Sequence, residues 1–187
     1  MALAEPKLDL HAYFAWENAQ PERHEFYRGE TFAMVGVRRV LGMVSLNVAL
    51  ALKSALRGSP CEVFTESLKV QVADDAVFYP DVFVTCHADD LRTEMVFRHP
   101  TLIVEVLSDS TQGYDRSLKF ATYRRIADLR EYVLIDPDSR SVEVFRRNER
   151  NLFELHDFTD AAELELPSVQ LHIPMAEVFA GVEPLPA

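Results

Sequence analysis

Two carboxylates lie inside apolar runs of this sequence, where charged side chains are rare. Glu105 stands in the middle of residues 101–107 (Thr-Leu-Ile-Val-Glu-Val-Leu), and Asp81 stands in residues 78–84 (Phe-Tyr-Pro-Asp-Val-Phe-Val). Short apolar runs of this kind are typical of strands buried on both faces. An isolated buried anion costs many kcal/mol, so carboxylates are seldom buried without a partner. We therefore expect a metal ion or a basic side chain to meet Glu105.

A lysine further along the chain completes a set of groups suited to phosphodiester cleavage. Residues 114–119 open a predicted helix in which Asp115 and Lys119 are four positions apart and share one face. Hydrolysis needs an activated water, neutralisation of the negative charge on the phosphate oxygens and a stabilised leaving group. Carboxylates that hold Mg²⁺ or Mn²⁺ supply much of this, and a lysine beside the metal orients the water. Asp81, Glu105 and Lys119 are therefore candidate catalytic residues, with both strand acids as metal ligands and Asp115 in support.

Each of these residues also has a simpler interpretation. Pro80 removes a ladder donor and predicts a strand edge or a bulge, where Asp81 would hydrogen-bond a loop backbone instead of a metal. Glu105 would form a buried ion pair with Lys119 or an arginine that serves packing alone. Asp115 and Lys119 would form an ordinary stabilising pair on a helix surface. These explanations account for any one residue more easily than for the set.

Composition places the chain among single-domain globular proteins. It has 187 residues, 48% of them hydrophobic, and we expect one domain over residues 1–187 without a membrane-spanning segment. The formal net charge of -11 opposes a simple nucleic-acid-binding protein, because phosphate contacts need local positive charge. It does not exclude a nuclease, since metal ions neutralise acids at a site. Arg116, Arg124 and Arg125 on the predicted helix are candidates for DNA contact, and a solvated helix surface is the alternative.

The cysteines and histidines show no spacing typical of a metal site. Cys61 and Cys86 lack the pattern of a metal knuckle or a disulfide framework, which predicts two buried thiols in a reducing cytoplasm. The six histidines have no metal-ligand spacing either. We therefore expect the chemistry of the chain to rest on its acids.

The periodicity along the chain predicts a mixed α/β fold. Helices are expected over residues 8–18, 39–56 and 112–126, with a hairpin over residues 25–35 that turns near Gly29. Strands are expected at 61–64, 68–72, 77–85, 101–107, 132–137 and 142–145, with a loop at 86–98 and a small helix at 175–179. The order strand, helix, strand from residue 101 to 136 indicates a βαβ-type unit, so the class is α/β or α+β with a mixed sheet.

The order of these motifs resembles that of a known family. The segments that carry the resemblance are Pro80-Asp81, residues 103–108, Tyr114-Asp115-Arg116, Lys119 and residues 130–136. Together they are similar to the Uma-type family of putative restriction endonucleases, within the PD-(D/E)XK nuclease-like superfamily, over about residues 25–181. The resemblance implies a restriction-endonuclease-like core over about residues 22–182, with a mixed β-sheet flanked by helices and additional β-hairpins. It also implies an endonuclease that hydrolyses DNA phosphodiester bonds with Mg²⁺ or Mn²⁺.

The resemblance also implies roles for individual residues. Asp81 and Glu105 match the metal ligands, with the carbonyl of Val106 as a third contact. The superfamily usually carries its lysine two places after the second acid, where this sequence has Leu107. Members of this family look as if the lysine has moved to the following helix, and Lys119 matches that position.

Two further positions bear on the site. Glu30 matches an acid common in the family's first hairpin and is expected to complete the site through metal or water; an exposed hairpin acid is the alternative. Family members often carry a histidine where this sequence has Leu41. A catalytically inactive nuclease-like module that binds protein or nucleic acid is therefore the alternative function. A surplus of apolar strands toward the C-terminus predicts a homodimer by analogy.

Overall fold

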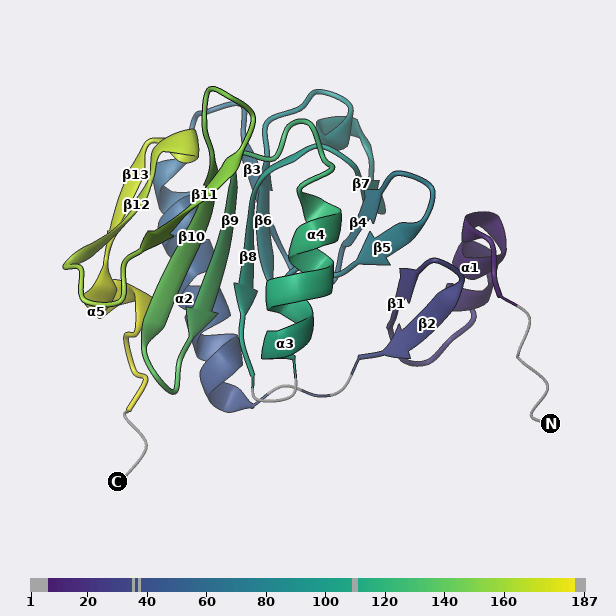
Figure 1. The fold of residues 1–187 in the computed structure, drawn as a ribbon, viewed down its shortest axis with the longest axis horizontal. Helices are drawn as coiled ribbons and strands as arrows, with labels where there is room; N and C mark the ends of the chain where they lie inside the picture. Colours follow the sequence, from purple (N-terminus) through teal and green to yellow (C-terminus); the bar gives the residue numbers. More distant parts are fainter. Residues whose placement is uncertain (1–6, 35, 37, 109–110, 184–187) are drawn as a thin grey trace.

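The computed structural model describes residues 7–34, 36, 38–108 and 111–183. Its centre is a six-stranded sheet with the strand order β11-β10-β9-β8-β6-β3 (Figure 1). The strands are β3 (Glu62–Thr65), β6 (Val82–Thr85), β8 (Pro100–Val106), β9 (Glu131–Asp136), β10 (Ser141–Arg147) and β11 (Phe153–Asp157). β8 and β9 run parallel and the other neighbours antiparallel, so the predicted mixed sheet is confirmed.

Helices cover both faces of this sheet (Figure 1). One face carries α2 (Arg39–Ala55), and the other carries a helical segment made of α3 (Gln112–Tyr114), η2 (Asp115–Lys119) and α4 (Phe120–Tyr123). This segment connects the parallel strands β8 and β9, which confirms the predicted βαβ unit. The segment is helical to Tyr123 rather than to residue 126, and η2 within it is a π-helical turn.

Strand β8 contributes to both layers, because successive side chains of a strand point to opposite faces. Leu102 and Val104 belong to the core that contains the buried side of α2. Ile103 belongs to the core that contains Tyr123 of α4. Glu105 has the same parity as Ile103 and therefore faces the α3–α4 side.

A five-stranded sheet with the order β2-β1-β5-β4-β7 lies beside the central one (Figure 1). Its strands are β1 (His24–Tyr27), β2 (Glu30–Ala33), β4 (Lys69–Val72), β5 (Ala76–Phe78) and β7 (Val96–Phe97), and α1 (Leu10–Glu17) packs on it. The predicted hairpin is confirmed as far as Ala33, and residue 35 lies outside the described residues. Arg28 and Gly29 have φ angles of 49° and 92°, as a two-residue hairpin turn with positive φ at both positions requires.

The prediction of one strand over residues 77–85 is wrong. The chain leaves β5 at Phe78 and enters β6 at Val82, so the two halves belong to different sheets. Pro80 lies in the gap, where its missing N–H cannot continue a ladder. This break places Asp81 directly before β6.

The predicted loop at 86–98 holds two short elements, η1 (Asp90–Arg92) and β7, which pairs parallel with β4. At the C-terminus, β12 (Glu163–Leu166) and β13 (Leu171–Pro174) flank η3 (Pro167–Val169) and pair antiparallel. They pack with α5 (Met175–Val178) on the α2 side of the central sheet. Among the described residues, no helix combines the length and apolar character needed to cross a membrane.

Cys61 and Cys86 form a disulfide, which overturns the prediction of two buried thiols. Glu62 of β3 pairs with Thr85 of β6, so one further step along each antiparallel strand sets the two cysteines opposite each other. They are 25 positions apart in the sequence and become neighbours only through sheet register. The cysteine count alone does not reveal that register.

Candidate active site

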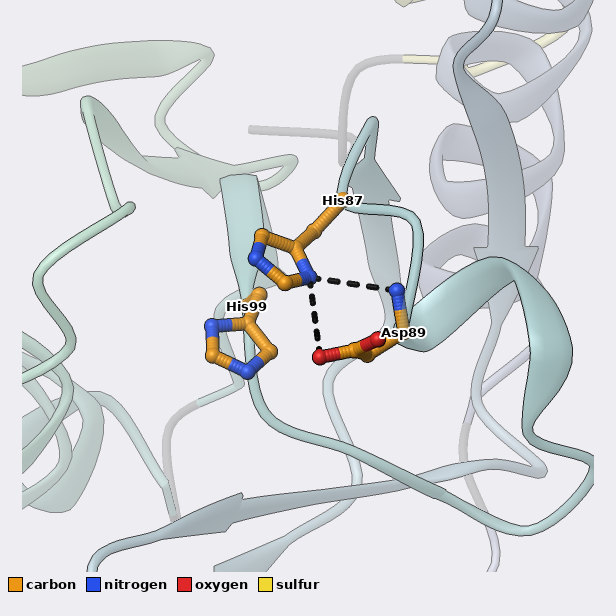
Figure 2. Close-up of side chains that lie close together, drawn as sticks. All are labelled: His87, Asp89 and His99. Atoms are coloured by element: carbon orange, nitrogen blue, oxygen red, sulfur yellow. Dashed lines mark hydrogen bonds and ion pairs between the residues drawn. The ribbon is translucent and has the colours of Figure 1, made fainter.

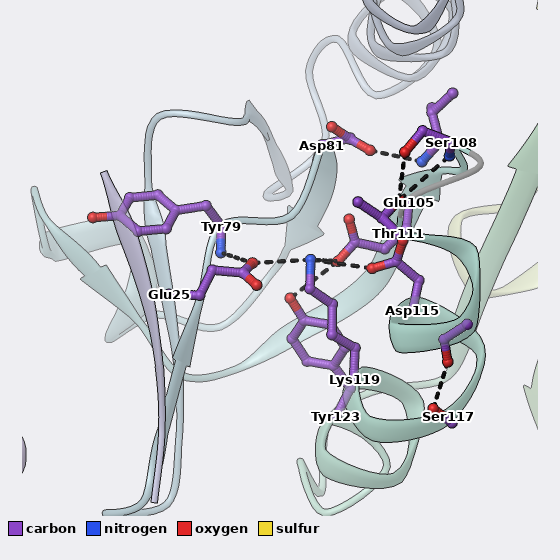
Figure 3. Close-up of polar contacts among 12 residues, drawn as sticks. Glu25, Tyr79, Asp81, Glu105, Ser108, Thr111, Asp115, Ser117, Lys119 and Tyr123 are labelled. Atoms are coloured by element: carbon purple, nitrogen blue, oxygen red, sulfur yellow. Dashed lines mark hydrogen bonds and ion pairs between the residues drawn. The ribbon is translucent and has the colours of Figure 1, made fainter. Parts of the chain in front are cut away.

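Strands β6 and β8 bring the two predicted strand acids together. Val82 pairs with Val104 in antiparallel register, so one step further sets Asp81 beside Glu105 on the same face. Oδ2 of Asp81 accepts a hydrogen bond of 2.6 Å from the main-chain N–H of Val106 (Figure 3). Both carboxylates line one cavity of about 440 Å³.

The helical segment supplies a cation to this cavity. Asp115, Lys119 and Tyr123 recur every four residues, so they project from one side of the segment toward β8 (Figure 3). Nζ of Lys119 lies 3.3 Å from Oε1 of Glu105 and 3.3 Å from Oδ1 of Asp115. The hydroxyl of Tyr123 donates to Oε1 of Glu105 at 3.3 Å. Asp115 and Lys119 bound the π-helical turn η2, and such turns occur frequently at functional sites.

The first hairpin contributes Glu25, which the sequence reasoning missed. Its Oε1 lies 2.9 Å from Nζ of Lys119 and accepts a hydrogen bond of 3.2 Å from the main-chain N–H of Tyr79. Glu25 is buried in β1 beside the core residue Phe26. Glu25 follows the polar residues Arg23 and His24 and does not lie within an apolar run as Glu105 does, so the local pattern did not single it out.

Glu30 does not join the other acids, so its expected place in the site needs correction. Its side chain is 60% exposed and pairs with Lys7, with 3.3 Å between Oε1 and Nζ. Glu30 begins β2 next to the hairpin turn, and most of β2 is exposed. Glu25 lies inside β1, where it and the next residue, Phe26, are buried. The structure therefore bears out the alternative of an exposed hairpin acid.

Apolar side chains also line the cavity. Phe32, Ala33 and Met34 from the hairpin and Leu41 from α2 line it. Leu41 is 5% exposed. The position at which the resemblance places a histidine thus lies at the same cavity as the acids, but leucine offers neither a ligand nor a proton there.

Burial raises the pKa of both strand acids. The pKa of Asp81 rises from an ordinary 3.8 to about 6, because burial outweighs the hydrogen bond from Val106 and the attraction of Lys119. Burial also raises the pKa of Glu105 well above its usual range, with Lys119 opposing the rise and the neighbouring acids adding to it. For Lys119, burial lowers the pKa, but the attraction of the three carboxylates around it more than reverses this. The ammonium therefore keeps its charge.

The residues of this site fit a divalent metal ion. Carboxylate oxygens are hard ligands of the kind that Mg²⁺ and Mn²⁺ prefer. Four acids, Glu25, Asp81, Glu105 and Asp115, line the cavity with two bases, Arg38 and Lys119. Lys119 touches three of the acids, and Arg38 forms an ion pair with Asp138. Oδ1 of Asp115 is buried and accepts no hydrogen bond from a described residue, since its contact with Lys119 lacks hydrogen-bond geometry. The surplus of acids over bases and an Asp115 oxygen without a hydrogen-bond donor among the described residues both favour a bound cation.

The arginines predicted to contact DNA lie outside this cavity. Arg116 forms an ion pair with Glu143, and Nη1 of Arg125 donates to Asp75 at 3.1 Å. Arg124 is exposed. None of the three is among the described residues that line the cavity. Arg116 and Arg125 therefore already have acidic partners, and their contact with DNA stays a prediction.

Comparison with known proteins gives a family and two relatives. A family model, Uma2, described as "Putative restriction endonuclease", matches residues 10–176. The uncharacterized protein slr1290 of Synechocystis is 31% identical over 178 residues, which are 95% of this chain and 94% of that protein. A second uncharacterized Synechocystis protein, sll1609, is 31% identical over 138 residues, 72% of this chain and 78% of that protein.

A solved structure has the same fold. The crystal structure of a protein described as a putative nuclease belonging to DUF820, from Anabaena variabilis, superposes with a TM-score of 0.76. The match covers 92% of this chain and 98% of that one, at 18% sequence identity. The predicted mixed α/β fold with flanking helices is thereby confirmed.

Proposed function

Because the chain belongs to the Uma2 family of putative restriction endonucleases, we propose that it is an endonuclease that hydrolyses DNA phosphodiester bonds. The proposed cofactor is Mg²⁺ or Mn²⁺, held by Asp81 and Glu105. The observation that carries the proposal is the meeting of these carboxylates in one cavity, with Nζ of Lys119 3.3 Å from Glu105.

Hydrolysis adds water across a phosphorus–oxygen bond. The water oxygen bonds to phosphorus, the bond to the sugar oxygen breaks, and that oxygen takes up a proton. A divalent ion at the two strand acids would neutralise the phosphate oxygens and lower the pKa of a bound water. The carbonyl of Val106 is a further ligand in this proposal. Its N–H already holds Asp81 in place.

The chain's own residues would do the positioning. Lys119 is buried and charged, so its ammonium can donate to a phosphate oxygen or to the attacking water. Glu25 and Asp115 hold that ammonium at 2.9 and 3.3 Å and limit the places it can reach. Tyr123 donates to Glu105 and fixes the orientation of this carboxylate. Such fixed geometry supplies a large part of the rate enhancement in phosphoryl transfer.

A second function, binding without cleavage, is favoured by Leu41. It lines the cavity where family members often carry a histidine. If that histidine takes part in the chemistry, this chain would be a nuclease-like module that binds nucleic acid or protein. Metal binding and cleavage must therefore be measured separately.

Cleavage of plasmid and oligonucleotide DNA, titrated with Mg²⁺ and Mn²⁺, tests the proposal. Asp81→Asn, Glu105→Gln and Lys119→Met should each abolish metal-dependent cleavage. The control is Glu30→Gln, which changes an exposed acid of the β1–β2 hairpin outside the cavity. This variant should cleave as the unmodified protein does. Equal cleavage by all four variants would refute the assignment. Metal binding that depends on Glu105 without any cleavage would favour the binding module.

A homodimer belongs to this proposal. β11 is the edge strand of the central sheet, and its Leu155 is 53% exposed, beside Leu152 at 54%. Exposed apolar side chains on an unpaired edge favour pairing with a second copy. Sedimentation of the protein and of a Leu155→Lys variant tests it, since a monomer in both cases would refute the dimer.

A cytoplasmic location is also proposed, because DNA would be the substrate. The disulfide between Cys61 and Cys86 opposes this location, since disulfides are rare in a reducing cytoplasm. Alkylation of free thiols in freshly lysed cells, followed by mass spectrometry, distinguishes a reduced pair from an oxidised one.

A further inference from the structure

Two histidines and an aspartate gather at the end of β6 and β8 that lies away from the acids of the candidate active site. His87 follows β6 and His99 precedes β8. Because these strands are antiparallel neighbours, both histidines lie at the same end of the strand pair. Asp89 lies beside them, with its Oδ2 4.0 Å from Nδ1 of His87 (Figure 2). One potential ligand atom from each of the three lies within 4.8 Å of the others.

The backbone that carries these side chains is held in place by two buried residues. The hydroxyl of Thr85 donates to the carbonyl of His99 at 3.0 Å and accepts from the N–H of His87 at 3.2 Å. The carboxylate of Asp90 accepts from the N–H of Arg98 at 2.9 Å and from the N–H of His99 at 2.8 Å. Both segments are thereby fixed relative to each other before any ligand binds.

A second carboxylate orients one of the imidazoles. Oδ2 of Asp128 lies 2.7 Å from Nδ1 of His99, the ring nitrogen that faces away from Asp89. A carboxylate accepts from this nitrogen when it carries the proton, which leaves the lone pair on Nε2 of His99. Metal-bound histidines almost always donate their other nitrogen to a carboxylate or carbonyl in this manner.

The lone pair on Nδ1 of His87 accepts a hydrogen bond of 3.2 Å from the main-chain N–H of Asp89. A metal ion bound at this nitrogen would replace that hydrogen bond. The rings of His87 and His99 stack with 3.9 Å between centroids and 17° between planes.

We propose that His87, Asp89 and His99 bind a divalent transition-metal ion, with Zn²⁺ as the best fit. Two imidazoles and one carboxylate, with a further position for water, are a ligand set that zinc commonly takes. Ligand atoms at about 2.0–2.2 Å from zinc lie roughly 3.5 Å from one another. The three atoms must therefore approach by about 1 Å, and Asp89, whose side chain is 73% exposed, has room to rotate. One of the two stacked imidazoles must also turn, because each ring binds a metal in its own plane and the planes are 17° apart. The bound ion would link the two ends of the segment between His87 and His99.

Competition between the protein and a chromophoric zinc chelator, in excess Mg²⁺, measures this site. Mg²⁺ occupies hard oxygen sites and leaves an imidazole site to Zn²⁺. We expect one zinc per chain, and Co²⁺ in its place should give the visible spectrum of a nitrogen-ligated ion. His87→Asn and Asp89→Asn change partly exposed side chains, so the variants should fold, and each should weaken zinc binding by about a hundredfold or more. Asp128→Asn should weaken it by about 10–100-fold.

The control is His172→Asn. Its Nδ1 lies 3.7 Å from Glu163, an exposed pair of similar chemistry without a second histidine, and zinc binding should be unchanged. The proposal is overturned if folded protein binds no zinc, or if His87→Asn or Asp89→Asn binds it with unchanged affinity. It is also overturned if only Asp81→Asn removes the ion. Loss of DNA cleavage has no bearing on these outcomes, because the acids lie at the other end of the two strands.

Discussion

Replacing Asp81 with asparagine should stabilise the metal-free protein while removing its proposed activity. Burial raises the pKa of Asp81 to about 6, so the ionised carboxylate is less stable in the fold than in the unfolded chain. Asparagine removes the charge and keeps an oxygen that can accept from the N–H of Val106.

The size of the effect follows from the pKa. A rise from 3.8 to about 6 corresponds to roughly 3 kcal/mol at a pH above both values, at about 1.4 kcal/mol per unit. Loss of a charge-assisted hydrogen bond from Val106 offsets part of this gain. We therefore expect Asp81→Asn to raise the free energy of unfolding by about 1–3 kcal/mol near pH 8.

The raised pKa of Asp81 also fixes the direction in which stability changes with pH. Between about pH 4 and pH 6 the folded protein binds more protons at Asp81 than the unfolded chain does, so its stability falls as the pH rises through this window. The gain in free energy of unfolding from Asp81→Asn should be absent below about pH 4, reach about half its full size near pH 5 and reach its full size above about pH 6.

Urea unfolding in the presence of a chelator measures this difference. The midpoint should shift at an unchanged slope, which separates a change in stability from a change in the unfolded state. Mg²⁺ should then stabilise the unmodified protein and leave Asp81→Asn unaffected, because binding to the folded state alone adds stability. A variant that is less stable than the unmodified protein near pH 8 without metal, or a difference that does not vary with pH, would refute the reasoning.

Three further changes have expected outcomes. Lys119→Met should lower the metal-free free energy of unfolding by about 3–5 kcal/mol in urea, because it leaves buried carboxylates without their cation; a loss below 1 kcal/mol would contradict this. Glu25→Gln should lower kcat for cleavage by about tenfold or more, because Lys119 would be placed less well. Glu30→Gln should leave kcat unchanged. Similar kcat values for the two variants would refute the role of Glu25 in positioning Lys119. Reducing the disulfide should lower the unfolding free energy by about 3 kcal/mol, and Cys61→Ser should be insensitive to the reductant.

The strand acids could be predicted because their environment is local. A charge inside an apolar run indicates a buried carboxylate whatever the fold, and this applied to Glu105 and Asp81. The four-residue spacing of Asp115 and Lys119 predicted one shared helix face, and in the structure this face lies toward Glu105 of β8. The roles of these residues as metal ligands and catalysts stay predictions.

The contributions that the sequence could not indicate depend on distant segments. Glu25 and Glu30 lie in one hairpin, and which of them enters the cavity depends on how the second sheet packs against the first. The Cys61–Cys86 disulfide depends on the register of β3 and β6 in the same way. Pro80 predicted a strand edge or a bulge, but not that the chain passes from one sheet to the other at this point.

The charge balance of the cavity bears on the choice between an enzyme and a binding module. Four carboxylates line it with two bases, Arg38 and Lys119, and Lys119 touches three of the acids. The raised pKa values of Asp81 and Glu105 show that ionising these acids costs stability in the metal-free fold. A module that only presents its outer surface to a partner needs no such cavity, because amides in place of the acids would fill the same space without the cost. A bound divalent cation removes the repulsion and turns the same residues into a stabilising site. The electrostatics of the metal-free fold therefore favour a metal-binding centre even though Leu41 replaces a histidine of the family.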